Sequence, residues 1–252
     1  MVIPIHDANP VRRVPVVTYA LLLVNVVVFL IEPISRAPLG GVGPAQACRQ
    51  EAFFREYGAI PRELLSNEQL PQTVLGPVAE GCLVGPPDYE KRPFVSALTA
   101  MFLHGGWLHL IGNMLLLFVF GNNVEDRLGR VRYLLWYLVW GLVATYAFAA
   151  TMPSSESVVV GASGAIAGVL GAYLLLFPRA KVISLLTFFF FIPARLPAWL
   201  VLGSWFGLQW MYAAGTGVTK GSGVAYLAHV VGFIAGAVTA LRYRERTVPR
   251  WG

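Results

Sequence analysis

The sequence predicts an all-α polytopic membrane protein, with six transmembrane helices in a single membrane domain. Composition is the first indication, because 56% of the 252 residues are hydrophobic and only 13% are charged. A typical soluble domain is about 45–50% apolar and about 25% charged. The second indication is a set of six apolar segments long enough to cross a bilayer. The net charge of +6 is modest and has no basic-aromatic pattern, so it does not indicate a nucleic-acid partner.

The six segments follow one another along the chain. A helix that crosses the hydrocarbon core needs about 20 mostly apolar residues. The segments that qualify are 14–31, 107–123 with an apolar lead-in from 94, 133–150, 158–177, 196–213 and 224–241. The first follows Arg12 and Arg13 and has no small-residue cleavage site after it, so we expect a retained anchor and not a signal peptide. The run "VISLLTFFFF" (182–191) is too short to span, and prolines follow it, so we expect an interfacial loop there.

The distribution of Lys and Arg predicts the orientation. With the N-terminus in the cytoplasm, the inner segments hold 12 of these residues and the outer segments hold 7, six of them in one long loop. Long loops count for little in the positive-inside rule. We therefore expect a multi-pass protein of a bacterial-type plasma or inner membrane with both termini cytoplasmic. Its parts are a short N-terminus (1–13), a membrane domain (14–241) that includes outer loop 33–93, and a basic tail (242–252).

The outer loop contains both cysteines of the chain, Cys48 and Cys82. Disulfides persist on the outer side of a membrane. One disulfide that closes the loop is therefore our hypothesis, and two unpaired thiols are the alternative.

A few polar side chains lie within the predicted spans, and such residues are costly there and often functional. They are Asn25, His109, Asn113, Ser163, Gln209 and His229. At 1.5 Å per residue, Ser163 and His229 both lie roughly 8 Å below the outer boundary, with His109 and Asn113 at about 3 and 9 Å. Four polar groups on three helices therefore share one shallow layer.

Glycines bear on how closely two of these helices approach. Gly161, Gly164, Gly168 and Gly171 line the fourth segment, and Gly232 and Gly236 form a GxxxG after His229. Small residues let helix backbones pack closely. If the fourth and sixth segments are neighbours, Ser163 and His229 come within hydrogen-bond reach.

Other interpretations of this layer exist. A lone serine in a membrane helix usually bonds the carbonyl four residues back, and a polar cluster can form a structural network or a proton or ion path.

If the layer is catalytic, His229 is the base for a Ser163 nucleophile. No carboxylate lies nearby, so a dyad is expected. Candidate donors to an oxyanion are the Asn113 amide, the His109 ring N–H and the Ser163 backbone N–H. The G-x-S-x-G elbow does not fit, because Ala165 occupies its last position.

Four stretches carry a resemblance to a known family. They are "HGGWLHLIGN" (104–113), "GNNVEDRLG" (121–129), "GASG" (161–164) and "AHVVGFIAG" (228–236). In this order, over about 94–241, they resemble the rhomboid family of intramembrane serine proteases. The resemblance implies a rhomboid-like bundle of six helices that cleaves single-pass transmembrane protein substrates in the lipid bilayer, with neither metal nor cofactor.

The resemblance also implies roles for particular residues. Ser163 is the expected nucleophile and His229 its base. His109 and Asn113 are expected to bind the oxyanion, with Gly161 beside them in the oxyanion and substrate site. His104 matches a structural histidine. Glu125 and Arg127 are expected to brace the loop after the second span.

The sequence departs from the family pattern at two places. Val95 and Ser96 stand where some members carry a Trp-Arg pair. Ala167 stands where some members carry an aromatic residue against which the histidine stacks, so Tyr226 or an aromatic on another helix is the expected substitute. The segment "GTGVTKGSG" (215–223) is either a gating cap above His229 or a plain turn.

The sequence leaves two alternative functions open. A catalytically silent relative that binds membrane clients is the first, although silent members usually lack the serine or the histidine. A small transporter is the second, but no inverted repeat or intramembrane carboxylate supports it.

Overall fold

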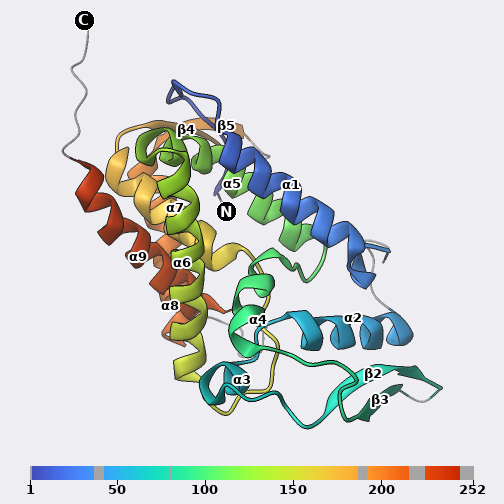
Figure 1. The fold of residues 1–252 in the computed structure, drawn as a ribbon. Coiled ribbons are helices and arrows are strands. Elements are labelled where there is room, and N and C mark those ends of the chain that lie inside the picture. Colours follow the sequence, from blue (N-terminus) through green and yellow to red (C-terminus); the bar gives the residue numbers. More distant parts are fainter. Residues whose placement is uncertain (1, 37–42, 80, 187–191, 216–224, 245–252) are drawn as a thin grey trace, which may run out of the picture.

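A computed structural model gives the fold, and it describes residues 2–36, 43–79, 81–186, 192–215 and 225–244. Helices dominate these residues (Figure 1). In chain order the elements are β1 (Val2–Asp7), α1 (Val16–Ile31), η1 (Pro33–Arg36), α2 (Pro44–Tyr57), α3 (Pro61–Ser66), β2 (Thr73–Val78), β3 (Gly81–Gly85), α4 (Pro93–Thr99), η2 (Ala100–Phe102), α5 (Trp107–Leu128), α6 (Arg130–Thr151), α7 (Ser163–Leu176), β4 (Lys181–Leu186), β5 (Ile192–Pro197), α8 (Ala198–Ala213) and α9 (Tyr226–Arg244).

Each of the six predicted apolar segments contains a helix, namely α1, α5, α6, α7, α8 and α9. Within the described residues, α5, α6 and α9 are long and apolar enough to cross a membrane. Helices α1 and α7 are apolar but shorter. The protein is thus a largely helical membrane protein, and the count of six spans stays a prediction.

Two helix boundaries differ from the prediction by five residues, and the others differ by less. Helix α7 begins at Ser163 and not at Val158. The preceding residues stay out of the helix because Val159 pairs with Ala59 and Gly161 has φ +126°. Helix α5 continues to Leu128, so the stretch 121–129 is mainly helical and is not a loop. Gly129, with φ +84°, ends α5 and leads directly into α6.

The all-α expectation is wrong for two small sheets. Strands β1, β4 and β5 form an antiparallel sheet with β4 in the middle, and β2 pairs with β3. The run expected to be an interfacial loop therefore contains strand β4, which pairs with β1 from Val2 opposite Leu186 to Asp7 opposite Val182. Its β-branched residues suit a strand, while residues 187–191 of that run lie outside the described residues. Figure 1 places the two sheets at opposite ends of the helices.

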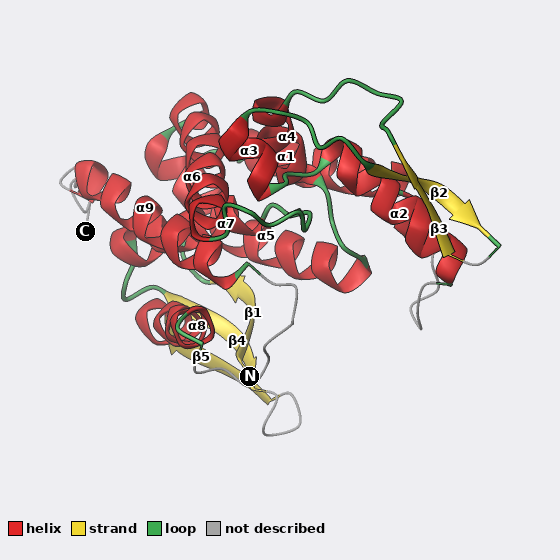
Figure 2. Cartoon of the chain, turned by 90° about the horizontal axis from the view of Figure 1, so that it is seen from below, coloured by secondary structure: helices red, strands yellow, loops and turns green. Residues whose placement is uncertain are grey.

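The described part of 33–93 lies at one end of the helices, where Figure 1 shows α2, α3, β2 and β3, and Figure 2 shows β2 and β3 beside α2. A disulfide joins Cys48 in α2 to Cys82 in β3, with a Cα–Cα distance of 5.4 Å. The hypothesis of a bridge closing this loop is therefore confirmed. Lys91 Nζ lies 2.6 Å from Glu63 Oε2, and both side chains are almost completely buried.

Helix α7 is the centre of the helical core, and it contacts α5, α6, α8 and α9. Its residues from Ala165 to Tyr173 are all buried, as expected for a helix that is apolar on every side. Glycines permit the close packing of α7 on α9. A Cβ on Gly236 would collide with the carbonyl oxygen of Gly168, and a Cβ on Gly171 would collide with that of Phe233.

Candidate active site

Ser163 is the first residue of α7, and a non-helical segment leads into it. Ala59 and Val159 exchange two backbone hydrogen bonds, of 3.1 and 2.7 Å. The N–H of Gly161 donates to the carbonyl of Ala100 at 2.8 Å. Two separate parts of the chain therefore fix the backbone just before Ser163. Because Ser163 opens its helix, it has no helical carbonyl four residues back to bond.

The structure brings Ser163 and His229 together. Ser163 Oγ lies 2.8 Å from Nε2 of His229, which is on α9. One turn further along α9, a Cβ on Gly232 would collide with the carbonyl oxygen of Gly164. The glycine therefore lets α9 approach α7 closely enough for the histidine ring to reach the serine.

Helix α8 contacts the other side of the His229 ring. Gln209 Oε1 lies 2.7 Å from His229 Nδ1, and the ring centroid of Trp205 lies 6.0 Å from that of His229 at an interplanar angle of 34°. The Tyr226 ring meets His229 edge-on at 6.3 Å. The aromatic neighbours expected in place of residue 167 are thus Trp205 and Tyr226.

Sequence reasoning missed the roles of Trp205 and Gln209. Gln209 stands out as an amide in an apolar segment, but nothing in its own helix indicates that His229 is its partner. Trp205 lies four residues before Gln209, so the two share a face of α8. This spacing of four residues is the sequence feature that could have indicated that both side chains contact the same group.

His109 lies near the start of α5 and beside Gly161. The N–H of Gly105 donates to His109 Nδ1 at 3.2 Å, so a neutral ring carries its proton on Nε2. Gly161 has φ +126°, and a Cβ there would lie 2.9 Å from His109 Cε1 and 3.0 Å from Nε2. A glycine is therefore required at 161 both by the backbone conformation and by the adjacent imidazole. The His109 ring therefore lies beside Gly161, which is two residues before Ser163 in the sequence.

Asn113 lies one turn after His109 and is buried. Its Nδ2 donates to the His109 carbonyl at 3.0 Å, which uses one of the two amide N–H groups. Further donors come from α7 itself, since the first N–H groups of a helix lack intrahelical partners and its N-terminus favours negative charge. Asn25, another amide in a predicted span, lies in α1 and donates to the Leu21 carbonyl of that helix.

A buried carboxyl supports the loop that precedes α5. Glu32, just after α1, is fully buried, and its Oε1 accepts the backbone N–H of His104 at 3.0 Å. Burial raises the pKa of the Glu32 carboxyl to about 7, while the hydrogen bonds from His104 and Gln50 act in the opposite direction. The His104 ring meets the His109 ring edge-on at 5.2 Å. The structural role of the His104 side chain stays a prediction.

Glu125 and Arg127 brace helices at the opposite end of α5. Glu125 accepts the backbone N–H of Val17 at 3.0 Å and that of Thr18 at 2.7 Å. Arg127 donates to the carbonyl of Tyr243 at 2.9 Å. The expectation that they brace a loop is wrong, because the stretch is helical and the partners of both side chains are the ends of α1 and α9. Among the predicted features, the segment 215–223 lies almost wholly outside the described residues.

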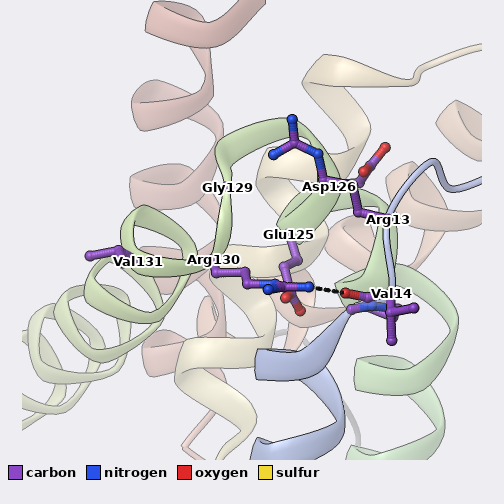
Figure 3. Close-up of a pocket in the computed structure, with 8 residues that line it drawn as sticks. Arg13, Val14, Glu125, Asp126, Gly129, Arg130 and Val131 are labelled. Atoms are coloured by element: carbon purple, nitrogen blue, oxygen red, sulfur yellow. Dashed lines mark hydrogen bonds between the residues drawn. The ribbon is translucent and has the colours of Figure 1, made fainter.

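A hollow lies at this braced end (Figure 3). It is lined by Arg13, Val14, Pro15, Glu125, Asp126, Gly129, Arg130 and Val131. Arg130 donates to the Val14 carbonyl there at 3.3 Å. Sixteen residues of α5 separate Glu125 from His109, which is about 24 Å of helix. The hollow is therefore separate from the Ser163–His229 pair.

Comparison with known proteins matches residues 91–246 to the family model of the Rhomboid domain. "RHOMBOID-like protein 5" of Arabidopsis thaliana is 36% identical over 135 residues, which cover 48% of this chain and 44% of the relative. "Putative rhomboid protease YdcA" of Bacillus subtilis is 40% identical over 77 residues, covering 31% and 38%. "Rhomboid protein 1, mitochondrial" of Saccharomyces cerevisiae is 32% identical over 149 residues, covering 57% and 40%. The matches thus span less than half of each relative's own length.

Proposed function

The chain belongs to the rhomboid family, and from that premise we propose that it is an intramembrane serine protease that cleaves transmembrane proteins. Ser163 is the nucleophile and His229 the general base. The observation that carries the proposal is the distance of 2.8 Å between Ser163 Oγ and His229 Nε2. Family membership alone does not separate a protease from a catalytically silent relative. The intact pair favours the protease.

The first chemical step follows from this geometry. A serine hydroxyl is a weak nucleophile until a base takes its proton. His229 Nε2 accepts the hydroxyl proton as Oγ attacks the scissile carbonyl carbon of a substrate. The tetrahedral intermediate then collapses, the imidazolium gives its proton to the leaving amine, and an acyl-enzyme remains on Ser163. Water, activated by the same imidazole, hydrolyses that ester.

The negative charge on the tetrahedral oxygen needs donors. We assign this role to the Nε2–H of His109, the amide of Asn113 and the backbone N–H of Ser163, with Gly161 leaving room beside them. The hydrogen bond from Gly105 to His109 Nδ1 supports the required tautomer. Each preorganised donor contributes about 3–4 kcal/mol to stabilising the transition state.

Cleavage of a reconstituted single-span substrate tests the proposal. Wild type is expected to release a cleaved fragment, whereas Ser163→Ala and His229→Ala are expected to release none. Ser204→Ala is the matched control, because its hydroxyl donates to the Val201 carbonyl of its own helix. Full activity in either dyad variant would refute the mechanism. Client binding without cleavage by wild type would instead support the silent relative.

We also propose that the protein crosses the membrane six times with both termini cytoplasmic. In this arrangement residues 1–13 and 242–252 flank the membrane domain 14–241, and residues 33–93 lie outside. The disulfide between Cys48 and Cys82 supports an outer, oxidising location for that loop. Fusions of alkaline phosphatase and of a fluorescent protein to the C-terminus, made in a bacterial host, test the topology. Active phosphatase at the C-terminus would contradict it.

A further inference from the structure

The dyad leaves one atom of the imidazole to be explained, namely Nδ1 of His229. Its partner in the structure is the side-chain oxygen of Gln209, at 2.7 Å. The two residues come from different helices, α9 and α8. A hydrogen bond at this nitrogen decides which nitrogen of a neutral imidazole carries the proton.

The direction of both hydrogen bonds follows from the chemistry of the groups. To act as base, Nε2 must accept the proton of Ser163, so a neutral His229 carries its hydrogen on Nδ1. That N–H can donate to an amide oxygen. The Gln209 oxygen is therefore the correct partner, and the amide nitrogen in its place would favour the unreactive tautomer.

The surroundings make this acceptor more important than it would be in water. A polar group in a membrane interior must find its partner within the protein. Without an acceptor at Nδ1, the imidazole gains by moving its proton to Nε2, where it can no longer accept from Ser163. The oxygen of Gln209 removes that competing state.

Trp205 adds a second restraint from the same helix. It lies four residues before Gln209, so both side chains project from one face of α8. Its ring lies against that of His229, with centroids 6.0 Å apart. The amide thus restrains rotation of the imidazole within its plane, while the indole restrains its tilt.

We propose that Gln209 is a positioning residue that holds His229 in the tautomer and orientation required to deprotonate Ser163. The proposal rests on the protease function proposed above. It gives the site a neutral third member in the place that a carboxylate occupies in a Ser-His-Asp triad. Gln209 acts on the reaction through His229 and needs no contact with substrate.

Two substitutions of Gln209 separate this role from packing. Gln209→Leu keeps a similar volume and removes the acceptor, so kcat is expected to fall about tenfold to hundredfold with little change in KM. Gln209→Glu keeps an oxygen at the same reach and is expected to restore most of the lost kcat. Ser204→Ala, on the same helix, is expected to behave as wild type.

A spectroscopic measurement tests the same idea without turnover. Nitrogen-15 NMR of histidine-labelled protein, with His229 assigned by its loss in His229→Ala, reports which ring nitrogen is protonated. Wild type and Gln209→Glu are expected to show the proton on Nδ1. Gln209→Leu is expected to show a substantial fraction with the proton on Nε2.

The outcomes distinguish this proposal from the proposed function. Wild-type kcat and an unchanged tautomer in Gln209→Leu would overturn the role of Gln209 while the protease stands. Gln209→Glu as impaired as Gln209→Leu would also overturn it, because an acceptor alone would not explain the loss. If wild type cleaves nothing, the protease function fails, and the tautomer measurement still decides whether Gln209 sets the state of His229.

Discussion

Ser163 Oγ lies 2.8 Å from Nε2 of His229, although 66 residues separate the two in the chain. The contact depends on glycine at the crossing of α7 and α9, where Gly232 faces the carbonyl of Gly164. It also depends on α8, whose Gln209 meets the far nitrogen of the ring. The candidate site is therefore held by packing between helices, and the predictions below test that dependence.

Enlarging a glycine at the α7–α9 crossing should reduce catalysis. In Gly236→Ala the new methyl group would collide with the Gly168 carbonyl, which pushes α9 and His229 away from Ser163. A displacement of about 1 Å is expected to lower turnover about 100-fold, measured by substrate cleavage in liposomes. Gly203→Ala in α8 is the control, because a Cβ there meets nothing within 4 Å. Equal activity of the two variants would contradict the packing argument.

Replacing Gly161 should disturb the oxyanion site. Gly161→Ala places a methyl group against the His109 ring at a residue whose φ is +126°. We expect a loss of turnover larger than the loss of thermal stability would explain. Gly76→Ala is matched in backbone conformation, with φ +149°, but its Cβ would meet nothing within 4 Å. If Gly76→Ala lowers turnover as much as Gly161→Ala, the contact with His109 is not the cause.

The buried ion pair within residues 33–93 should be more sensitive to substitution than a surface pair. Burial lowers the pKa of Lys91, and its pairing with Glu63 opposes this shift. Lys91→Met leaves the Glu63 carboxylate buried without its partner, which is expected to cost about 3–5 kcal/mol. The exposed Arg62–Glu156 pair is the control, and Arg62→Met is expected to cost at most about 1 kcal/mol.

Thermal unfolding in detergent, with mapped proteolysis of residues 44–93, measures this difference. The double variant Glu63→Leu/Lys91→Met is expected to recover part of the loss, because it removes both buried charges. Similar unfolding temperatures for Lys91→Met and Arg62→Met would show that the buried pair is unimportant.

Glu32 should make stability depend on pH. Its pKa is raised from 4.5 to about 7 in the folded protein. Between these values the folded state holds a proton that the unfolded state has released, so stability falls as pH rises through this interval. The contribution is complete below about pH 4.5 and lost above about pH 7. Glu32→Gln cannot ionise and should lack this component.

The measurement is the thermal midpoint of wild type and Glu32→Gln from pH 4.5 to 8. The wild-type midpoint is expected to fall relative to that of the variant as pH rises. Curves that stay parallel across the whole range would mean that Glu32 does not bind a proton on folding in this interval.

Most of the helices can be predicted from the sequence, because a long apolar segment in a membrane has few alternatives to a helix. The ends of the helices and the positions of the strands are harder to predict. Val159, one of the valines before Gly161, forms a β-bridge with Ala59, which lies about 100 residues earlier. Strand β4 depends in the same way on β1 at the start of the chain. Pairings between such distant segments leave no local pattern, so the sequence predicts a helix at 158–162 and a loop at 182–186, where the structure has a β-bridge and strand β4.

The candidate site was predictable to a similar degree. Depth along the spans and glycine spacing indicated Ser163, His229, His109 and Asn113 as one layer. Those features are periodic along single helices. No periodic feature indicates the partner of His229 Nδ1, because Gln209 reaches this atom only through the packing of α8 on α9. An amide in an apolar helix indicates that a partner exists without naming it.

The most direct test of the central claim is the reaction of Ser163 with a fluorophosphonate. The probe is incubated with the membrane-embedded protein, and the labelled residue is identified by mass spectrometry. We predict one adduct on Ser163 in wild type, with labelling strongly reduced in His229→Ala and unchanged in Ser204→Ala. Labelling of His229→Ala at the wild-type rate, or no adduct on Ser163 in active protein, would contradict a serine activated by His229.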